Sequence, residues 1–398
     1  MSNKGKILIV KLNDRLLSML IRDNRIRSIE VQKQSEYAVG NIYIGKVRNI
    51  SENIGAAFVN LGQNYITFLP LAESKHAIVT NRVFDGKLKA EDEILVQIVK
   101  EPMKTKQAGV TANLSLSGNY VVVKANGGRM APIQVSSKLS RKQRNRFAAL
   151  EALQEIGKHC QIIVRTNAGG LEEETPLVEE AARLAKELVH IMQIADKRTC
   201  YSCLRTAAPD YLRFIQNAYT AEYDEIVTDL PEVYGILQEE LPKMCLSAPI
   251  RLYEGVLLPL YKLYAVESRL QELLDRKVWL KSGGYLVIEP TEALISIDVN
   301  TGKCERGHDK EETIFKINRE AAEMIALQLR ARNLSGMILV DFINMKDKER
   351  ERQLIEYMRS LLQKDSIPAD VVDMTGLGLM EITRKKVRPS LAEQMRKI

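Results

Sequence analysis

Short apolar runs separated by turn-forming residues fill the first part of the chain. Asn13-Asp14 and Asp23-Asn24 favour tight turns and divide the opening runs. Further runs follow at near-regular spacing up to about residue 113. The runs are Ile7–Val10, Leu16–Ile21, Asn41–Val47, Gly55–Leu61, Tyr65–Pro70 and Ile94–Val99. This pattern predicts a small meander of strands followed by a small barrel or sandwich.

From about residue 114 to residue 207 the pattern mixes strands and helices. It predicts a strand at Asn119–Lys124, the basic stretch Lys138–Arg146, a helical segment to Ile156, a strand at Gln161–Arg165 and a long helix. The basic stretch is typical of a solvated helix face, and contact with a nucleic-acid backbone is the sharper alternative.

The long helix has a recognisable start. We expect Thr175 to be its N-cap and Pro176 its first helical residue. Glu179 and Glu180 then fall in the first turn, where the helix dipole favours acidic side chains. From residue 208 to about residue 275 the pattern predicts mostly helix, interrupted at Pro231, Pro242, Pro249 and Pro259.

The last part of the chain, 276–398, alternates strands with helices. The pattern predicts strands and intervening helices in an order that is typical of an α/β unit. The expected strands are Tyr285–Glu289, Ala293–Val299, Met337–Ile343 and Val371–Met374, with helices at about 309–332 and 347–364.

Composition adds two constraints. A chain of 398 residues with 45% hydrophobic content can bury more than one core, so two to four compact units are expected. The 58 Lys and Arg residues outnumber the 51 Asp and Glu residues, which gives a net charge of +7. This balance favours nucleic acid over acidic partners, although many basic proteins bind no nucleic acid.

The five cysteines are odd in number and have no framework spacing, so we expect reduced thiols and no disulfide. Cys200 and Cys203 form a single CxxC that lacks the second ligand pair of a closed zinc site. The apolar run near the N-terminus is short and returns to charge at once, which predicts neither a signal peptide nor a membrane span. A cytoplasmic protein is therefore expected.

Two aspartates occupy similar positions, each at the end of an apolar strand pattern. Asp298 follows Leu-Ile-Ser-Ile, and Asp341 follows Met-Ile-Leu-Val. If the intervening helix is an ordinary crossover, the two strands run parallel and both carboxylates meet at one sheet edge. Such a pair suits Mg²⁺, and Asn300 is placed to orient Asp298. The alternative is that each aspartate only caps a helix or ends a strand.

Longer stretches around these aspartates resemble the catalytic segment of the ribonuclease E/G family. The order and spacing of the matching segments extend over about fifty residues, and other matches extend along nearly the whole chain. The matching segments are Ile297–Gly302, Glu311–Thr313, Asn318–Ala322, Gln328–Arg330, Leu334–Gly336, Val340–Ile343, Asn60–Gly62, Phe68–Pro70, Val164–Thr166 and Gly378–Arg384.

The resemblance implies an α/β, more fully α+β, fold of several subdomains. An RNase H-like subdomain is expected in two parts, 1–34 and 208–275. Inserted into it are an OB-fold RNA-binding subdomain at 35–113 and a 5′-end sensor subdomain at 114–207. A DNase I-like catalytic subdomain is expected at 276–398.

The resemblance also implies the chemistry. Asp298 and Asp341 correspond to the metal ligands, with Asn300 fixing the geometry of Asp298. The cofactor is Mg²⁺, for which Mn²⁺ can substitute. The implied enzyme is an endoribonuclease that cuts single-stranded, A/U-rich RNA in rRNA and tRNA processing and in mRNA decay, leaving 5′-phosphate and 3′-hydroxyl ends.

Two further sets of residues match the family's RNA-binding positions. Phe58 and Phe68 correspond to stacking aromatics, and Lys104 and Lys106 to residues that neutralise the RNA backbone. The phenylalanines could instead be barrel core, and the lysines a solvated loop. The family's pocket for a 5′-monophosphate falls on Gly118, Val122, Arg165 and Thr166. Arg165 could instead pair with a nearby glutamate.

The chain also departs from the family pattern. It reaches Ile398 without a CPxC-type zinc link, so no zinc link is expected, and a homodimer is one possible assembly. The long disordered scaffold of the family's larger members is also absent from this sequence, so the chain resembles the shorter, ribonuclease G-like form. Two other classes stay open: a non-catalytic RNA-binding protein that uses the OB-fold and the basic surface, and a DNA nuclease, which rests on fold-level analogy alone.

Overall fold

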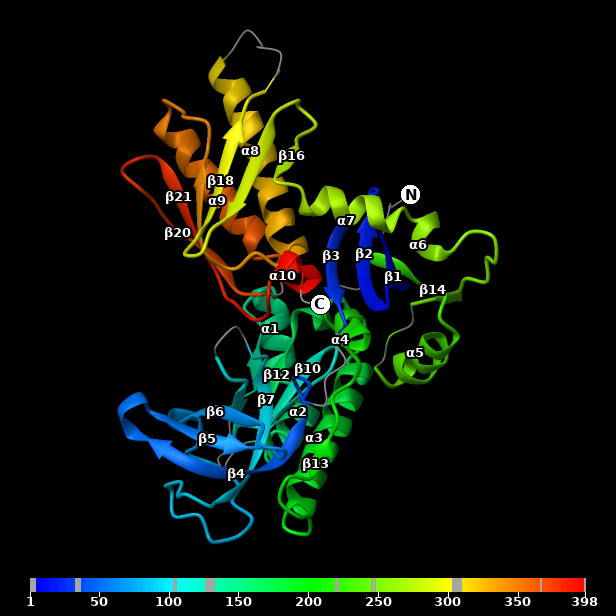
Figure 1. Cartoon of the computed structure of the whole chain (residues 1–398), viewed down its shortest axis with the longest axis vertical. Helices are drawn as coiled ribbons and strands as arrows, with labels where there is room; N and C mark the ends of the chain where they lie inside the picture. The colour runs from blue at the N-terminus through cyan, green and yellow to red at the C-terminus, as the bar shows by residue number, and fades with distance from the viewer. Residues whose placement is uncertain are drawn as a thin grey trace. The chain divides into compact units, whose positions relative to one another are not determined.

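The computed structural model describes the chain except residues 1–4, 33–36, 103–105, 126–132, 219–221, 245, 247, 303–309, 366 and 397–398. It divides into two compact units (Figure 1). The first unit contains residues 1–32, 222–234 and 249–398, and the second contains 33–221 and 235–248. This division is coarser than the five subdomains that the sequence predicts, so their boundaries stay a prediction.

The first unit contains a five-stranded sheet built from strands that are distant in the sequence. β1 (Gly5–Leu12), β2 (Arg15–Arg22) and β3 (Arg25–Val31) form an antiparallel meander. β14 (Tyr223–Thr228) and β15 (Ile250–Leu252) extend the sheet from β1 in parallel. The prediction that 208–275 is mostly helical is therefore wrong for these two strands.

The two missed strands are short, which explains the error. β14 has a continuous buried run at its end and no alternation of apolar and polar residues, and such runs do not distinguish a buried strand from a helix. The expected interruption at Pro242 is also wrong, because α5 (Pro231–Lys243) continues through this proline into its last turn. The helices α6 (Leu260–Leu263) and α7 (Val266–Leu274) follow β15.

The second sheet of the first unit has six strands. Their order is β16 (Lys277–Trp279), β17 (Tyr285–Pro290), β18 (Ile295–Asn300), β19 (Gly336–Asp341), β21 (Leu379–Arg384) and β20 (Ala369–Met374). β18 and β19 are parallel, and the other neighbours are antiparallel. The parallel pair is joined through α8 (Lys310–Ala331), as the alternating pattern predicts, whereas that pattern alone did not reveal β16 or β21.

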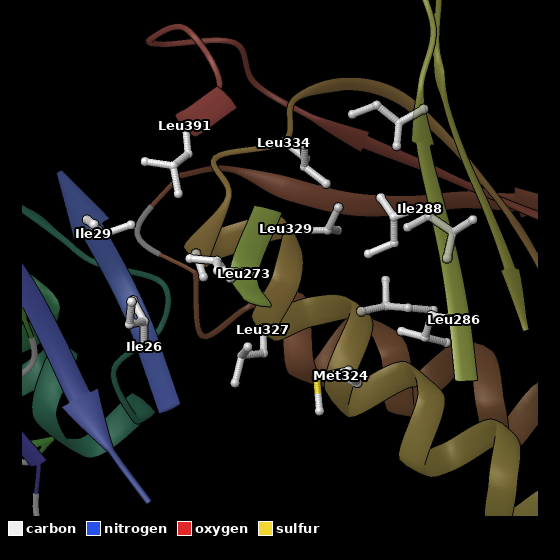
Figure 2. Packing of buried hydrophobic residues seen from close by; sticks show 14 of the residues in the cluster. Ile26, Ile29, Leu273, Leu286, Ile288, Met324, Leu327, Leu329, Leu334 and Leu391 are labelled. Atoms are coloured by element: carbon white, nitrogen blue, oxygen red, sulfur yellow. The ribbon is translucent and has the colours of Figure 1, made fainter. Parts of the chain in front are cut away.

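One face of this sheet is buried beneath α8 and α9 (Lys348–Leu362). Alternate strand residues such as Ile297, Val299, Ile338 and Val340 belong to the core, together with Ala321 of α8. The same core includes residues of β3, α7 and α10 (Leu391–Arg396), as Figure 2 shows for Ile26, Ile29, Leu273 and Leu391. The residues between the buried ones project from the opposite face of the sheet.

The second unit contains a closed barrel of five strands. The strands β4 (Ile42–Ser51), β5 (Ala56–Asn60), β6 (Ile66–Pro70), β8 (Gly109–Thr111) and β7 (Glu93–Lys100) pair in this order, and β7 pairs again with β4. β13 (Cys203–Arg205) adds to β4. The predicted small barrel is confirmed, and its strand number is that of an OB-like barrel.

A four-stranded sheet and its helices complete the second unit. The strands are β11 (Gln134–Val135), β12 (Cys160–Val164), β10 (Val121–Ala125) and β9 (Ser115–Ser117), in this order. The helices are α1 (Arg141–Ala148), α2 (Glu151–Ile156), α3 (Thr175–Ala195) and α4 (Asp210–Asn217). One stripe of α3, including Ala181, Leu184 and Leu188, shares a core with Val121 and Ile162 of the sheet.

The start of α3 differs from the prediction by one residue. The helix begins at Thr175, and Glu174 is its N-cap. The backbone of Glu174 already has helical dihedral angles, which moves the start of the helix one residue towards the N-terminus. Neither Glu179 nor Glu180 is in the first turn, so that prediction is wrong, and the side chain of Glu180 is buried. Among the described helices, none is both long enough and apolar enough to cross a membrane.

A buried ion pair fixes the end of the six-stranded sheet. Arg384 of β21 donates from Nε to Oδ2 of Asp365 at 2.8 Å, and the two side chains are 1% and 5% exposed. Its Nη1 also donates to Asn333 Oδ1, Leu334 O and Ser335 Oγ at 2.9 to 3.1 Å. Because the guanidinium is fully hydrogen-bonded on this side, the chain can bury its charge.

We expect Arg384→Met to lower the free energy of unfolding by about 3–5 kcal/mol, since it leaves the Asp365 carboxylate buried without its cation. Urea unfolding monitored by circular dichroism measures the change. Arg359→Met is the matched control, because Arg359 pairs with Glu356 on the surface of α9, where such a pair contributes about 0–1 kcal/mol. An equal loss of unfolding free energy in the two variants would contradict the conclusion that Arg384 and Asp365 form a stabilising buried ion pair.

Candidate functional site

Asp298 and Asp341 are direct neighbours in the six-stranded sheet. In the register of the parallel pair β18 and β19, Asp298 is opposite Asp341. Both side chains are exposed, and they lie on the face that α8 and α9 do not cover. Since neighbouring strands are about 4.8 Å apart, the two carboxylates start from adjacent backbone positions. The predicted meeting of the two aspartates at one place in the sheet is confirmed.

Asn300 contacts the first of these carboxylates. Its Nδ2 donates to Oδ2 of Asp298 at 2.6 Å. Asp298 and Asn300 are two residues apart on β18, so strand geometry puts both on the same face. The amide therefore restricts the orientation of the Asp298 carboxylate and leaves the other oxygen of that group available to a ligand.

The donor set fits a magnesium ion. Mg²⁺ is usually held by one or two carboxylates, while water and substrate phosphates occupy its other positions. The described residues contain no group of three or more His, Cys, Asp or Glu side chains that could enclose a metal ion. Two carboxylates with open coordination positions suit Mg²⁺, whereas a structural zinc site needs four protein ligands.

The predicted aromatic pair lies on the outside of the barrel. Phe58 of β5 and Phe68 of β6 are cross-strand partners, with ring centroids 6.2 Å apart in an edge-to-face arrangement. Both are half-buried, whereas Ala57, Val59 and Leu69 point into the barrel core. Core packing is therefore not the role of these two rings, and their outer position leaves them accessible to a ligand.

Sequence reasoning missed one lysine in the same row. Gly109 of β8 pairs with Phe68 on one side and with Lys100 of β7 on the other. The exposed Lys100 therefore lies in the cross-strand row that contains both rings. From the sequence alone, Lys100 is only the residue that follows a predicted strand, and its place beside the rings follows from the pairing of β8 with β6 and β7. Lys106 is exposed in the β7–β8 connection, and Lys104 lies outside the described residues.

Arg165 and Gly118 are brought into contact at one end of the four-stranded sheet. The Arg165 Nη1 donates to the carbonyl oxygen of Gly118, and Nη2 donates to Asn217 Oδ1 at 2.7 Å. Gly118 begins the tight turn between β9 and β10, where its N–H donates to Val121 O at 2.8 Å. The described contacts of Arg165 thus hold its guanidinium beside this turn.

The other two predicted pocket residues lie on the same sheet with different partners. The Thr166 hydroxyl, which follows Arg165, is 3.0 Å from the Ser136 hydroxyl. Val122 is half-buried on β10, between its partners Ser117 and Ile163. Ser136 was not predicted, because it contributes to the site through the pairing of β11 with β12 and not through any local motif.

A buried carboxylate supports the turn that Arg165 contacts. Glu180 of α3 is 1% exposed and accepts hydrogen bonds from the backbone N–H groups of Asn119, Tyr120 and Val121 at 2.7 to 3.1 Å. Burial raises the pKa of Glu180, and the three N–H donors oppose that rise. Only glycine fits at position 118, since a Cβ there would lie 2.3 Å from the Glu180 carboxyl carbon.

Comparison with known proteins shows the family to which the chain is similar. The model of the ribonuclease E/G family matches residues 115–387. Ribonuclease G of Escherichia coli (strain K12) is 32% identical over 382 residues, which are 92% of this chain and 76% of that protein. Ribonuclease G of Haemophilus influenzae is 32% identical over 388 residues, covering 94% and 77%. Ribonuclease E of Nostoc sp. is 32% identical over 389 residues, covering 95% and 55%.

These matches define an endoribonuclease, which is a hydrolase. The family model covers more than half of the chain, and the relatives match almost all of it. The chain therefore belongs to the ribonuclease E/G family, and the resemblance inferred from its motifs is confirmed.

We expect Glu180→Ala to lower the free energy of unfolding by about 3 kcal/mol or more, because it leaves three buried N–H groups without an acceptor. Chemical denaturation measures the loss. Glu179→Ala changes the exposed neighbour on the same helix and is expected to stay within about 0.5 kcal/mol of the unaltered protein. If the two variants were equally stable, the hydrogen bonds of Glu180 to residues 119–121 would not stabilise this turn.

Proposed function

We propose that this protein is a Mg²⁺-dependent endoribonuclease that cuts single-stranded, A/U-rich RNA and leaves 5′-phosphate and 3′-hydroxyl ends. The observation that carries the proposal is the register of Asp298 opposite Asp341 on the open face of the sheet. We place its activity in the cytoplasm, in the processing of rRNA and tRNA and in mRNA decay. The family membership supports the substrate class.

The roles of the chain's own residues follow from their positions. Asp298 and Asp341 would hold the ion, and Asn300 keeps the Asp298 carboxylate oriented before any ligand arrives. When bound, Mg²⁺ supplies an acidified water and neutralises charge on the scissile phosphate. Hydrolysis forms a bond between the water oxygen and phosphorus and breaks the bond to the 3′ oxygen, which takes up a proton.

Binding of the RNA strand is assigned to the outer row of the barrel. Phe58 and Phe68 offer ring surfaces on which bases of any sequence can stack, and each such contact contributes about 1–3 kcal/mol. Lys100 in the same row and Lys106 in the β7–β8 connection add positive charge, which makes binding dependent on salt. The cross-strand row that contains Phe58, Phe68 and Lys100 is continuous across four strands of the barrel.

Recognition of the RNA 5′ end is assigned to Arg165 and Thr166. A terminal monophosphate carries more charge than an internal phosphodiester, and a guanidinium beside a hydroxyl matches its oxygens. Gly118 and Val122 belong to the strands and turn that surround them. Asn217, which shares the Arg165 guanidinium, would give up this contact when phosphate binds.

The fold supports names for the subdomains. The first five-stranded sheet, with three antiparallel and two parallel strands, fits the RNase H-like subdomain, and the closed barrel fits the OB-fold. We assign the four-stranded sheet to the 5′-end sensor and the six-stranded sheet to the DNase I-like catalytic subdomain. A homodimer is the proposed assembly.

Asp298→Ala is expected to reduce cleavage of a 5′-monophosphorylated, A/U-rich oligonucleotide with Mg²⁺ by at least about a hundredfold, while RNA binding is retained. Gel analysis of end-labelled product measures the rate, and filter binding measures affinity. Asp370→Ala, which removes an exposed carboxylate on β20 of the same sheet, is the control and keeps its activity. Equal cutting by Asp298→Ala would remove the metal-site assignment.

A different outcome would favour another class. If the unaltered protein binds the oligonucleotide but cuts it with neither Mg²⁺ nor Mn²⁺, the non-catalytic RNA-binding alternative replaces the enzyme proposal.

Arg165→Gln is expected to lower the preference for a 5′-monophosphate over a 5′-triphosphate end by about tenfold, because a neutral amide loses the charge-assisted contact. The ratio of kcat/KM for the two substrates measures this preference. Arg144→Gln removes an exposed arginine from α1 of the same unit and is expected to leave the ratio unchanged. An unchanged ratio in Arg165→Gln would argue against the sensor.

A further inference from the structure

The single tryptophan of the chain lies on the sheet that contains the aspartate pair. Trp279 ends the edge strand β16, and its side chain is 58% exposed. A tryptophan buries more apolar surface than almost any other residue when it packs in a core, so exposure of this ring is unusual. None of the roles assigned above uses it.

The register places Trp279 on the same face as the catalytic residues. Val278 is paired with the buried Leu286 and packs against the core, so its neighbours Lys277 and Trp279 point to the opposite face. Trp279 is paired with Tyr285, which is in turn paired with Asn300. The ring is therefore in the cross-strand row of the amide that orients Asp298.

Lys277 occupies the adjacent row. This row runs from Lys277 through Val287 to Asp298 and Asp341. Two strand spacings of about 4.8 Å separate the backbone of Lys277 from that of Asp298. The distance places this lysine next to the site where the scissile phosphate would lie, without making it part of the carboxylate pair.

The aromatic and cationic groups of these rows form a cluster. The Lys277 ammonium lies 4.1 Å from the centroid of the Trp279 ring and 3.6 Å from that of the Tyr285 ring. The two rings meet edge to face at 5.4 Å. Lys281 is exposed two residues after Trp279, whereas Arg276, directly before Lys277, pairs with Glu289.

We propose that Trp279 and Lys277 form a stacking platform for an unpaired base of the RNA strand next to the cleavage site. The base stacks on the exposed indole, and Lys277 neutralises the adjoining backbone phosphate. This inference rests on the proposed function and extends it. The exposed Trp279 ring favours a planar partner, and the Lys277 ammonium favours an anionic one. A nucleotide of single-stranded RNA has both a planar base and an anionic phosphate.

Continuity with the aspartate pair determines what the platform does. A base held two strands from Asp298 restricts the position of the strand on which the metal-activated water acts, and correct positioning contributes to the rate. The platform is not sequence-selective, since every base has a ring face to stack. Its contribution is expected in the affinity for RNA and hence in KM.

Intrinsic fluorescence tests the contact directly, because Trp279 is the only tryptophan. The single-stranded A/U-rich oligonucleotide is titrated into the unaltered protein in EDTA and into Asp298→Ala, so that no cleavage occurs. We expect saturable quenching of the tryptophan emission with the single strand and none with a duplex of the same sequence, whose bases are already stacked. Binding seen by filter assay without any change in emission would overturn the platform.

Substitution tests its effect on the reaction. Trp279→Leu is expected to raise KM about tenfold, the equivalent of about 1.4 kcal/mol, with kcat changed much less. Trp279→Phe keeps a ring and is expected to restore most of the affinity. Leu257→Ala, in an exposed loop before α6, is the matched control for loss of an exposed apolar side chain. A Trp279→Leu enzyme with unchanged KM would contradict the proposal.

Lys277→Ala gives a second, independent measurement. Loss of one phosphate contact with a single strand is expected to reduce the slope of log affinity against log salt by about 0.7. An unchanged slope would show that Lys277 only packs on the rings. Failure of the platform is distinguishable from failure of the proposed function: in the first case the unaltered protein cuts RNA but the emission stays constant, and in the second it does not cut RNA at all.

Discussion

The pairing of β18 with β19 is the constraint on which the catalytic part of the structure depends. Two parallel strands joined through α8 must bury one face beneath that helix, so the positions of Ile297 and Val340 in the core fix the positions of Asp298 and Asp341 on the open face. A shift of one residue in either strand would turn an aspartate into the core. Hydrophobic packing on one side of the sheet therefore sets the spacing of the carboxylates on the other.

Much of this arrangement could be predicted from local signals. The turn formers at Asn13-Asp14 and Asp23-Asn24 have positive φ angles and connect the strands of the meander, as expected. The apolar runs before Asp298 and Asp341, with one amphipathic helix between them, were enough to predict a parallel pair. The position of Asn300 two residues after Asp298 also suggested its role, whereas the roles expected for Phe58 and Arg165 came only from the family motifs.

Other parts depend on contacts between residues distant in sequence, which no local pattern reveals. β14 and β15 are strands because they complete the sheet of β1, although their own residues resemble the helical segments around them. Glu180 looked like a surface glutamate on a helix, yet it binds the backbone of a turn about sixty residues earlier. Lys100 and Trp279 acquire significance only from the strand register.

The closure of the barrel has a consequence for how the molecule tolerates damage. Because β4 pairs with β5, β7 and β13, this one long strand keeps both neighbouring edges occupied. Unpaired strand edges invite pairing with other chains, and a closed barrel avoids that hazard. Proteolysis or an insertion within β4 would thus leave the edges of both β5 and β7 unpaired. The opened barrel would be prone to self-association while Phe58 and Phe68 still lie on its outer surface.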